Sequence, residues 1–326
     1  MELLIKWGDI LKTAFLFPGQ GSQKVGMSHD LYETYDVVKK IIKQADETLG
    51  FSISKLMFEG PDTELMKTEF TQPAILTASV CCLEILKEKG IEPDMVAGHS
   101  LGEYSALVAA GSLSFEDAVY IVHKRGKFMQ EAVPLGKGGM AAVIGSDPET
   151  ITAVCISVST REAPVEAVNF NCPGQTVIAG ETKAVEKACV ALREAGAKRA
   201  IMLKVSAPFH SILMEPAALR LKEILDKKEI KDAKIPVIAN YNAKEEIKAE
   251  DIRNNLVNQA AHAVHWEASV RNLIALGCGR TVECGPGTVL SGFMRKINKN
   301  ISSYHGEDIE SIDNIVNVWK GDDTWK

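Results

Sequence analysis

The stretch Gly98-His99-Ser100-Leu101-Gly102 has the form G-x-S-x-G and lies between two segments of different character. The apolar run Met95–Ala97 before it predicts a buried strand, and Leu101–Ala110 after it predicts a helix that ends at Gly111. A strand, a tight turn and a helix are the setting of a nucleophile elbow, which exposes the serine hydroxyl above a sheet. The helix N-terminus makes the Leu101 N–H a candidate donor to an oxyanion. A glycine-rich turn with an N-capping serine is the alternative interpretation.

The segments on both sides of the elbow alternate between strand and helix patterns, which predicts a parallel α/β sheet. The expected strands are Thr13–Phe17, Ile235–Ala239 and Thr281–Glu283. The expected helices are Leu31–Leu49, Thr71–Lys89, a helix starting at Ser114, Glu215–Asp226, Ala249–Ala261 and Trp266–Ala275. The tail after Asn300 is polar, and no element is predicted in it.

The middle of the chain has a different pattern. A glycine-rich linker, Pro134–Gly139, is followed by strands and helices in the order β-α-β-β-α-β, with Asn171–Gln175 as the hairpin loop. This order predicts a small ferredoxin-like insert over residues 133–206. The predicted fold class is therefore α/β, with an α/β-hydrolase-like parallel-sheet core formed by residues 1–132 and 207–326. The cleft between the core and the insert is the expected ligand site.

Bulk composition excludes several classes of function. The net charge of the 326-residue chain is −6, and no basic stripe suggests a nucleic acid partner. No run of about 18 apolar residues is present, so no membrane span is expected, and Met1–Lys12 lacks the apolar core of a signal peptide. The seven cysteines are odd in number and form no C-x-x-C pair. They indicate reduced thiols and a cytoplasmic protein rather than a disulfide framework or a metal site.

A serine nucleophile needs a base, and the sequence contains seven histidines. His210 follows Ser206–Phe209, where the chain re-enters the core domain, and Pro208 stiffens that segment. No acidic residue that would complete a triad is evident between Ser100 and His210. Arg125 lies on the same predicted helix face as several apolar residues, so it either extends to solvent or binds an anion.

Four motifs, in this order, resemble the malonyl-CoA:acyl carrier protein transacylases and the acyltransferase domains of fatty acid and polyketide synthases. They are Phe17–Gln23, Gly98–Tyr104, Ala207–Ser211 and Gly285–Leu290. The resemblance extends from about Thr13 to beyond Leu290, which is nearly the whole chain.

The resemblance implies roles for individual residues. Ser100 would be the nucleophile and His210 its base, with a carbonyl of Gln259 orienting the histidine in place of a carboxylate. The backbone N–H of Gln20 would join that of Leu101 in the oxyanion hole.

The same resemblance implies a substrate and partners. Arg125 would bind the free carboxylate of a malonyl group, and Phe209 would limit bulk near the malonyl α-carbon. We expect malonyl transfer from malonyl-CoA to the phosphopantetheine thiol of acyl carrier protein, through a malonyl-serine intermediate, to supply fatty acid synthesis. Both thioesters are substrates, so no cofactor and no metal are expected, and neither is a nucleic acid or membrane partner. We expect a monomer.

Three alternatives remain open. The chain could serve a polyketide synthase as a trans-acting acyltransferase, which would keep the chemistry and change the pathway. It could be a serine thioesterase or esterase, which the G-x-S-x-G motif alone would fit, although Arg125 and the missing triad acid argue against this. It could also be a non-catalytic docking module for a carrier protein.

Overall fold

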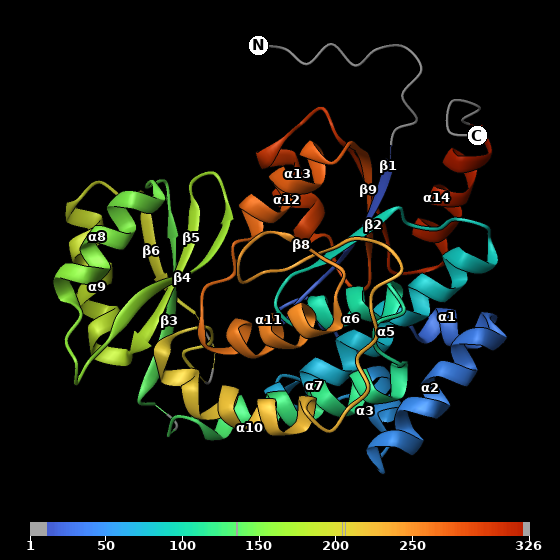
Figure 1. Cartoon of the computed structure of the whole chain (residues 1–326), viewed down its shortest axis with the longest axis horizontal. Helices are drawn as coiled ribbons and strands as arrows, with labels where there is room; N and C mark the ends of the chain where they lie inside the picture. The colour runs from blue at the N-terminus through green and yellow to red at the C-terminus, as the bar shows by residue number, and fades with distance from the viewer. Residues whose placement is uncertain (1–11, 135, 204, 206, 322–326) are drawn as a thin grey trace.

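The computed structural model describes residues 12–134, 136–203, 205 and 207–321. A large domain contains a six-stranded sheet, and an insert beside it contains a four-stranded sheet (Figure 1). Residues 1–11, where no signal peptide is predicted, and residue 206, at the predicted end of the insert, lie outside the described residues.

The large sheet has the strand order β10-β9-β1-β2-β7-β8. The first five strands pair in parallel, and β8 forms an antiparallel pair with β7 at one edge. The predicted parallel α/β core is therefore confirmed. In chain order, the strands are β1 (Lys12–Phe17), β2 (Met95–Gly98), β7 (Val237–Ile238), β8 (Glu245–Glu246), β9 (Cys278–Cys284) and β10 (Ser302–Gly306).

Helices cover both faces of this sheet, which gives the large domain three layers (Figure 1). In β1, Phe15 and Phe17 belong to one hydrophobic cluster, whereas Ala14 and Leu16 belong to the other. Successive residues of a strand point to opposite faces, so a strand covered on both faces is apolar throughout. The first cluster includes residues from α1 (His29–Thr34), α2 (Asp36–Leu49), α3 (Ile53–Glu59), α4 (Asp62–Leu65), α5 (Thr68–Glu88), α6 (Gly102–Ala109), α7 (Phe115–Glu131), α10 (Glu215–Leu225), α11 (Ala249–Ala261) and α14 (Ile309–Gly321). The second includes residues from α12 (Trp266–Ala275) and α13 (Val289–Ile297).

Helix α5 contributes many of its buried side chains to the first cluster. By length and composition it could cross a membrane, but 83% of its most apolar window is buried inside the protein. The helix starts earlier than predicted, so Pro73 lies inside it. Proline cannot donate to the carbonyl four residues earlier. Here that carbonyl, of Glu69, is 2.9 Å from Nδ1 of His123 on α7, which replaces the missing partner.

One prediction for the large domain was wrong, and one segment without a prediction is structured. The single helix expected over 31–49 is interrupted at Tyr35, whose backbone is extended (φ −111°, ψ 125°), and it forms α1 and α2. The polar tail is also structured, because it contains β10 and α14. Helix α14 buries Ile312, Ile315 and Val316, and the Trp319 ring lies 3.5 Å from the guanidinium carbon of Arg280.

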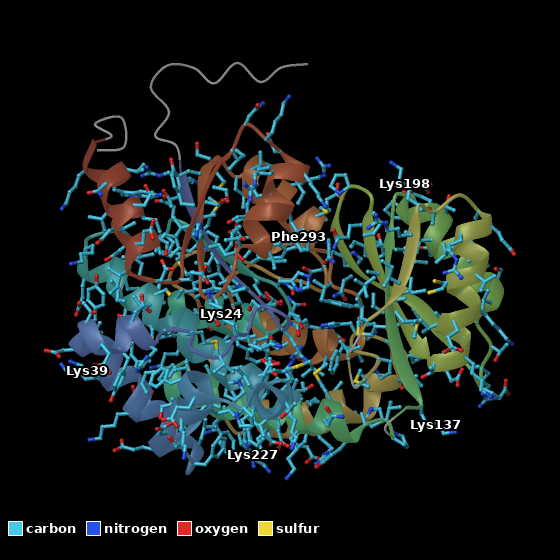
Figure 2. The ribbon with its side chains drawn as sticks, turned by 180° about the vertical axis from the view of Figure 1, so that it is seen from behind. Lys24, Lys39, Lys137, Lys198, Lys227 and Phe293 are labelled. Carbon is cyan, nitrogen blue, oxygen red and sulfur yellow. The ribbon has the colours of Figure 1, made fainter. Side chains whose placement is uncertain are left out.

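The insert consists of β3 (Gly138–Ile144), α8 (Pro148–Val158), β4 (Val165–Cys172), β5 (Gln175–Glu181), α9 (Thr182–Glu194) and β6 (Arg199–Met202). This is the predicted element order, and the antiparallel sheet has the strand order β4-β5-β3-β6. The hairpin loop is shorter than predicted, because β4 continues to Cys172. Lys137 and Lys198 lie at opposite ends of the insert (Figure 2).

The insert is joined to the large domain by main-chain hydrogen bonds. Val264, which precedes α12, donates to the carbonyl of Val168 at 2.8 Å and accepts from the N–H of Phe170 at 3.0 Å. Phe293 on α13 lies on the side of the large domain that faces the insert (Figure 2). These contacts position β4 beside the carboxyl edge of the large sheet.

The elbow depends on close contact between β1, β2 and α6. A Cβ atom at Gly98 would lie 1.9 Å from the carbonyl carbon of Gly102, and a Cβ at Gly102 would lie 2.0 Å from the carbonyl oxygen of Phe17. Real Cβ atoms do not approach other atoms so closely. Both positions therefore require glycine.

We expect Gly102→Ala to lower the free energy of unfolding by more than the ~1–3 kcal/mol typical of overpacking, since backbone rather than a flexible side chain must move. Gly292→Ala in α13 is the matched control. A Cβ at Gly292 would meet no heavy atom within 4 Å outside its own helix backbone, and alanine in a helix interior is about 0.5–1 kcal/mol more favourable than glycine. Urea unfolding of the two variants measures both effects. Equal stability of the two variants would contradict the close-contact argument.

Candidate active site

Ser100 lies in the turn between β2 and α6. Its φ is 52°, in the left-handed region that a non-glycine residue rarely adopts. Its Oγ is 2.7 Å from Nε2 of His210. The structure therefore brings together the two residues that the sequence predicts as nucleophile and base, 110 positions apart.

His210 follows β6 in the segment that returns to the large domain, and it too has a positive φ, of 63°. Its Nδ1 is 2.7 Å from the main-chain carbonyl oxygen of Gln259. A carbonyl can only accept, so Nδ1 carries the proton and Nε2 is free to accept one from Ser100. Burial, together with the positive charge of Arg125, lowers the pKa of His210 to about 3. His210 is therefore a neutral base at physiological pH.

Arg125 on α7 extends into the same site. Its Nη2 donates to Ser100 Oγ at 3.1 Å and to Gln259 Oε1 at 2.8 Å, and its Nη1 donates to Gln72 Oε1 at 2.8 Å. The side chain is only 1% exposed. The alternative in which Arg125 extends to solvent is thereby excluded. Gly126 makes this position possible, because a Cβ there would lie 2.5 Å from the carbonyl oxygen of Thr68 in α5.

The guanidinium of Arg125 binds three neutral oxygens. Within the described part of the chain, no carboxylate forms an ion pair with it, and its Nε has no hydrogen-bond partner. Arginine stays protonated in proteins, although burial lowers its pKa. The site therefore contains a buried positive charge beside the serine hydroxyl, which can bind an anion.

Gln259, on α11, contacts both members of the pair. Its main-chain oxygen accepts from His210, and its side-chain Nε2 donates to the main-chain oxygen of Ser100 at 2.8 Å. The residue is fully buried. The sequence predicts a carbonyl that orients the histidine, and Gln259 has one at the right place.

The two predicted oxyanion donors lie next to the serine. Leu101 directly precedes α6, so its N–H lies outside the helix's own bonding pattern. Gln20 belongs to the loop after β1. A Cβ at the neighbouring Gly19 would lie 2.5 Å from the main-chain oxygen of His99, so glycine allows this loop to approach the elbow.

A small cavity of about 120 Å³ connects these groups. Its lining includes Gln20, Ser100, Leu101, Arg125, Phe209 and His210. All predicted site residues except Gln259 line it directly. A volume of this size, a few water molecules, fits a short acyl group.

The other histidines near the elbow do not contact Ser100 in the described structure. His99 Nε2 lies 2.8 Å from Oδ1 of Asn171, and its ring packs against Trp266 at 5.5 Å. His262 is exposed and contacts the main-chain oxygen of Asn258 through Nδ1. His99 therefore has a packing role, and His262 lies at the surface.

Three residues of the site were missed in the sequence. Gln72 on α5 binds Arg125, Asn240 after β7 binds the elbow, and Glu103 binds both Asn240 and Gln259. The available signals were weak. Glu103 directly follows the elbow glycine, and Asn240 is a polar residue after the carboxyl end of a buried strand.

Comparisons with known proteins identify the family of this chain. The sequence profile of the acyl transferase domain matches residues 14–300, and the chain belongs to the acyl transferase family. The malonyl CoA-acyl carrier protein transacylase of Bacillus subtilis is 51% identical over 309 residues, which are 95% of this chain and 98% of the relative. The enzyme of that name from Haemophilus influenzae is 45% identical over 306 residues, 93% of this chain and 98% of the relative.

Solved structures agree as well. The crystal structure of an acyl carrier protein S-malonyltransferase from Vibrio cholerae has a TM-score of 0.91 and 44% identity, covering 93% of this chain and 99% of the other. A malonyl-transacylase in complex with its type II polyketide synthase acyl carrier protein has a TM-score of 0.92 and 44% identity, covering 94% and 99%. The chain is an acyltransferase.

The depressed pKa of His210 predicts an unusual titration. A histidine with an ordinary pKa near 6.5 is half protonated at that pH, whereas His210 stays neutral well below it. In ligand-free protein, we expect the ¹⁵N shifts of the His210 ring to stay constant between about pH 7.5 and pH 5. Arg125→Ala removes a repelling charge and should raise this pKa, whereas Arg125→Lys keeps the charge. His210→Ala assigns the signal, and a midpoint near 6.5 in the wild type would contradict the prediction.

Proposed function

We propose that this acyltransferase moves a malonyl group from malonyl-CoA to the phosphopantetheine thiol of acyl carrier protein, through a malonyl ester on Ser100. One observation carries the proposal most. The buried guanidinium of Arg125 lies 3.1 Å from Ser100 Oγ, and its hydrogen-bond partners are neutral oxygens. An acyl group with a free carboxylate would supply the missing negative charge, and a guanidinium can bind a carboxylate with two parallel hydrogen bonds.

In the first half-reaction, Ser100 Oγ attacks the thioester carbonyl while its proton passes to Nε2 of His210. The N–H groups of Leu101 and Gln20 would stabilise the negative oxygen of the tetrahedral intermediate. The bond between carbon and sulfur then breaks, and His210 returns its proton to the sulfur of CoA. The product is a malonyl ester on Ser100, with His210 neutral again.

In the second half-reaction, the thiol of the carrier replaces CoA. His210 takes the thiol proton, the sulfur attacks the ester carbonyl, and the bond to Ser100 Oγ breaks. Ser100 recovers its proton from His210. The two halves use the same groups in reverse order. CoA leaves before the carrier thiol reacts with the malonyl ester, which gives ping-pong kinetics.

Several features support transfer rather than hydrolysis. His210 is oriented by the Gln259 carbonyl, whereas a serine hydrolase triad orients its histidine with a carboxylate. The cavity is small and contains the apolar side chains of Met129, Met140 and Val177, which limits the room for water beside an acyl group. An esterase would instead release free malonate at the same rate with or without acceptor thiol.

The setting of the reaction is also part of the proposal. All seven cysteines are free and buried, which supports a reducing, cytoplasmic compartment. The reaction needs no cofactor, because both thioesters are substrates. We propose that a monomer supplies malonyl units for fatty acid synthesis. Similarity to a polyketide malonyl-transacylase favours polyketide synthesis as the second candidate, and comparing transfer to carrier proteins of the two pathways distinguishes them.

The covalent intermediate can be observed directly. After incubation with malonyl-CoA and no acceptor, we expect the intact mass to rise by one malonyl group, and Ser100→Ala should abolish this rise. Ser105→Ala is the matched control, because it removes a buried hydroxyl from the next turn of α6. An adduct that persists in Ser100→Ala would exclude Ser100 as the nucleophile.

Substrate selection depends on Arg125. A charge-assisted hydrogen bond contributes about 1.5–3 kcal/mol, and about 1.4 kcal/mol corresponds to tenfold. We therefore expect Arg125→Ala to lower kcat/KM for malonyl-CoA by about 10–100-fold, and Arg125→Lys to restore little. Activity on acetyl-CoA should stay level or rise, because the charge that opposes protonation of His210 is gone.

Lys127→Ala is the control for this experiment, since it removes a positive charge from an exposed position on the same helix. The measurement is the ratio of kcat/KM for malonyl-CoA to that for acetyl-CoA. If Arg125→Ala slows both substrates equally, the arginine has a structural role and malonyl selection by Arg125 is wrong.

A further inference from the structure

The turn that presents Ser100 has to be held in place. Its φ of 52° is unfavourable for a residue with a Cβ, and such a conformation persists only where the surrounding structure imposes it. Within the turn, the N–H of Gly102 bonds to the carbonyl of His99, and the N–H of Glu103 bonds to the carbonyl of Ser100. These bonds leave the N–H of Ser100 and the carbonyl of Gly98 to other partners.

Asn240 binds both of these groups with its side-chain amide. Its Oδ1 accepts from the N–H of Ser100 at 2.6 Å, and its Nδ2 donates to the carbonyl of Gly98 at 2.7 Å. Asn240 is fully buried. It comes two residues after β7, which pairs in parallel with β2 through Val96 and Ala97. The amide therefore continues the hydrogen bonding between these strands to the point where the main chain turns into the elbow.

Glu103 connects Asn240 to the segment that orients the base. A single oxygen, Oε2, accepts from the main-chain N–H of Asn240 at 2.9 Å and from Nε2 of Gln259 at 3.0 Å. The same Nε2 donates its other hydrogen to the carbonyl of Ser100, and the carbonyl of Gln259 accepts from His210. One fully buried carboxyl group thus connects the nucleophile's turn with the support of the base.

We propose that Asn240 and Glu103 are positioning residues for acyl transfer: Asn240 fixes the turn that directs Ser100 Oγ toward His210, and Glu103 fixes Asn240 and Gln259 relative to each other. Neither side chain contacts the reacting atoms. The inference rests on the proposed function, because the rate that it concerns is that of malonyl transfer to Ser100. A displacement of about 1 Å at a reacting group can cost on the order of 100-fold in rate.

The charge of Glu103 is less important in this arrangement than its acceptor oxygen. Burial raises the pKa of Glu103 to about 7. The hydrogen bonds from Gln259 and Asn240 and the charge of Arg125 lower this pKa, but their effect is smaller. A glutamine at this position has the same shape and can present a carbonyl oxygen to the same two donors. The positioning role therefore predicts that a glutamine at position 103 supports acyl transfer as glutamate does, whereas an alanine does not.

The test uses rapid-quench acylation of the full-length protein by malonyl-CoA, with the amplitude giving the fraction of active molecules. We expect Asn240→Ala to lower the rate constant of acylation per active molecule at least tenfold, with the KM for malonyl-CoA within about twofold of the wild type. Asn272→Ala is the matched control. It removes a side-chain hydrogen bond to the carbonyl of Ala243, which lies in the loop after β7 that also contains Asn240, but away from the elbow. This variant should change the rate constant less than threefold.

The pair Glu103→Gln and Glu103→Ala tests the connection separately and decides the question if Asn240→Ala does not fold. We expect Glu103→Gln to keep the rate constant within about threefold of the wild type, and Glu103→Ala to lose about tenfold or more. A rate constant near that of the wild type in Asn240→Ala, or equal losses in both Glu103 variants, would overturn the proposal. Failure of the proposed function gives a different result, since the wild type itself would then form no malonyl adduct.

Discussion

The site depends on one backbone constraint, the left-handed turn at Ser100 between β2 and α6. The turn requires the strand and the helix to approach so closely that neither Gly98 nor Gly102 can have a Cβ. Once this contact is made, the serine is placed at the carboxyl edge of a parallel sheet, where the loops after β1 and β7 also begin. The same geometry places Leu101 at the N-terminus of α6. The positions of Ser100 and of the Leu101 N–H thus follow from this backbone packing, together with the Asn240 side chain that binds the turn.

The second constraint on the site is the buried positive charge of Arg125 beside Ser100. A guanidinium that is 1% exposed and surrounded by neutral acceptors is costly to bury, and its hydrogen bonds to Gln72, Gln259 and Ser100 compensate only the polar part of that cost. The nearest acidic contribution comes from Glu103, which is connected to Arg125 through Gln259. In the proposed function, this charge near the nucleophile selects an anionic acyl group. Stability and specificity therefore oppose each other at Arg125.

Sequence patterns predicted the parts of the structure that depend on local order. The elbow and the insert's element order were predicted correctly, and the bounds of α11 and α12 were predicted to the residue. The roles proposed for Ser100, His210 and Gln259 came from the family resemblance, and the structure places these residues together. The missed parts depend on contacts between distant segments. Asn240 binds Ser100 across 140 positions, and Gln72 binds Arg125 across 53, so no local pattern identifies either. Helix α14 is a different case, since Ile312, Ile315 and Val316 have helical spacing in a tail whose polar composition concealed it.

The neutral acceptor behind His210 and the positive charge beside it act together on the base. A carboxylate at Nδ1 would stabilise the imidazolium in every state, with or without substrate. The Gln259 carbonyl does so weakly, and Arg125 lowers the pKa of His210 further. A malonyl carboxylate bound to Arg125 would cancel most of that repulsion, so His210 becomes a stronger base when the correct substrate is in place. An acetyl group has no carboxylate and leaves the repulsion unchanged. Under the proposed function, Arg125 would thus affect proton transfer as well as malonyl binding, and selectivity would arise in the chemical step as well as in binding.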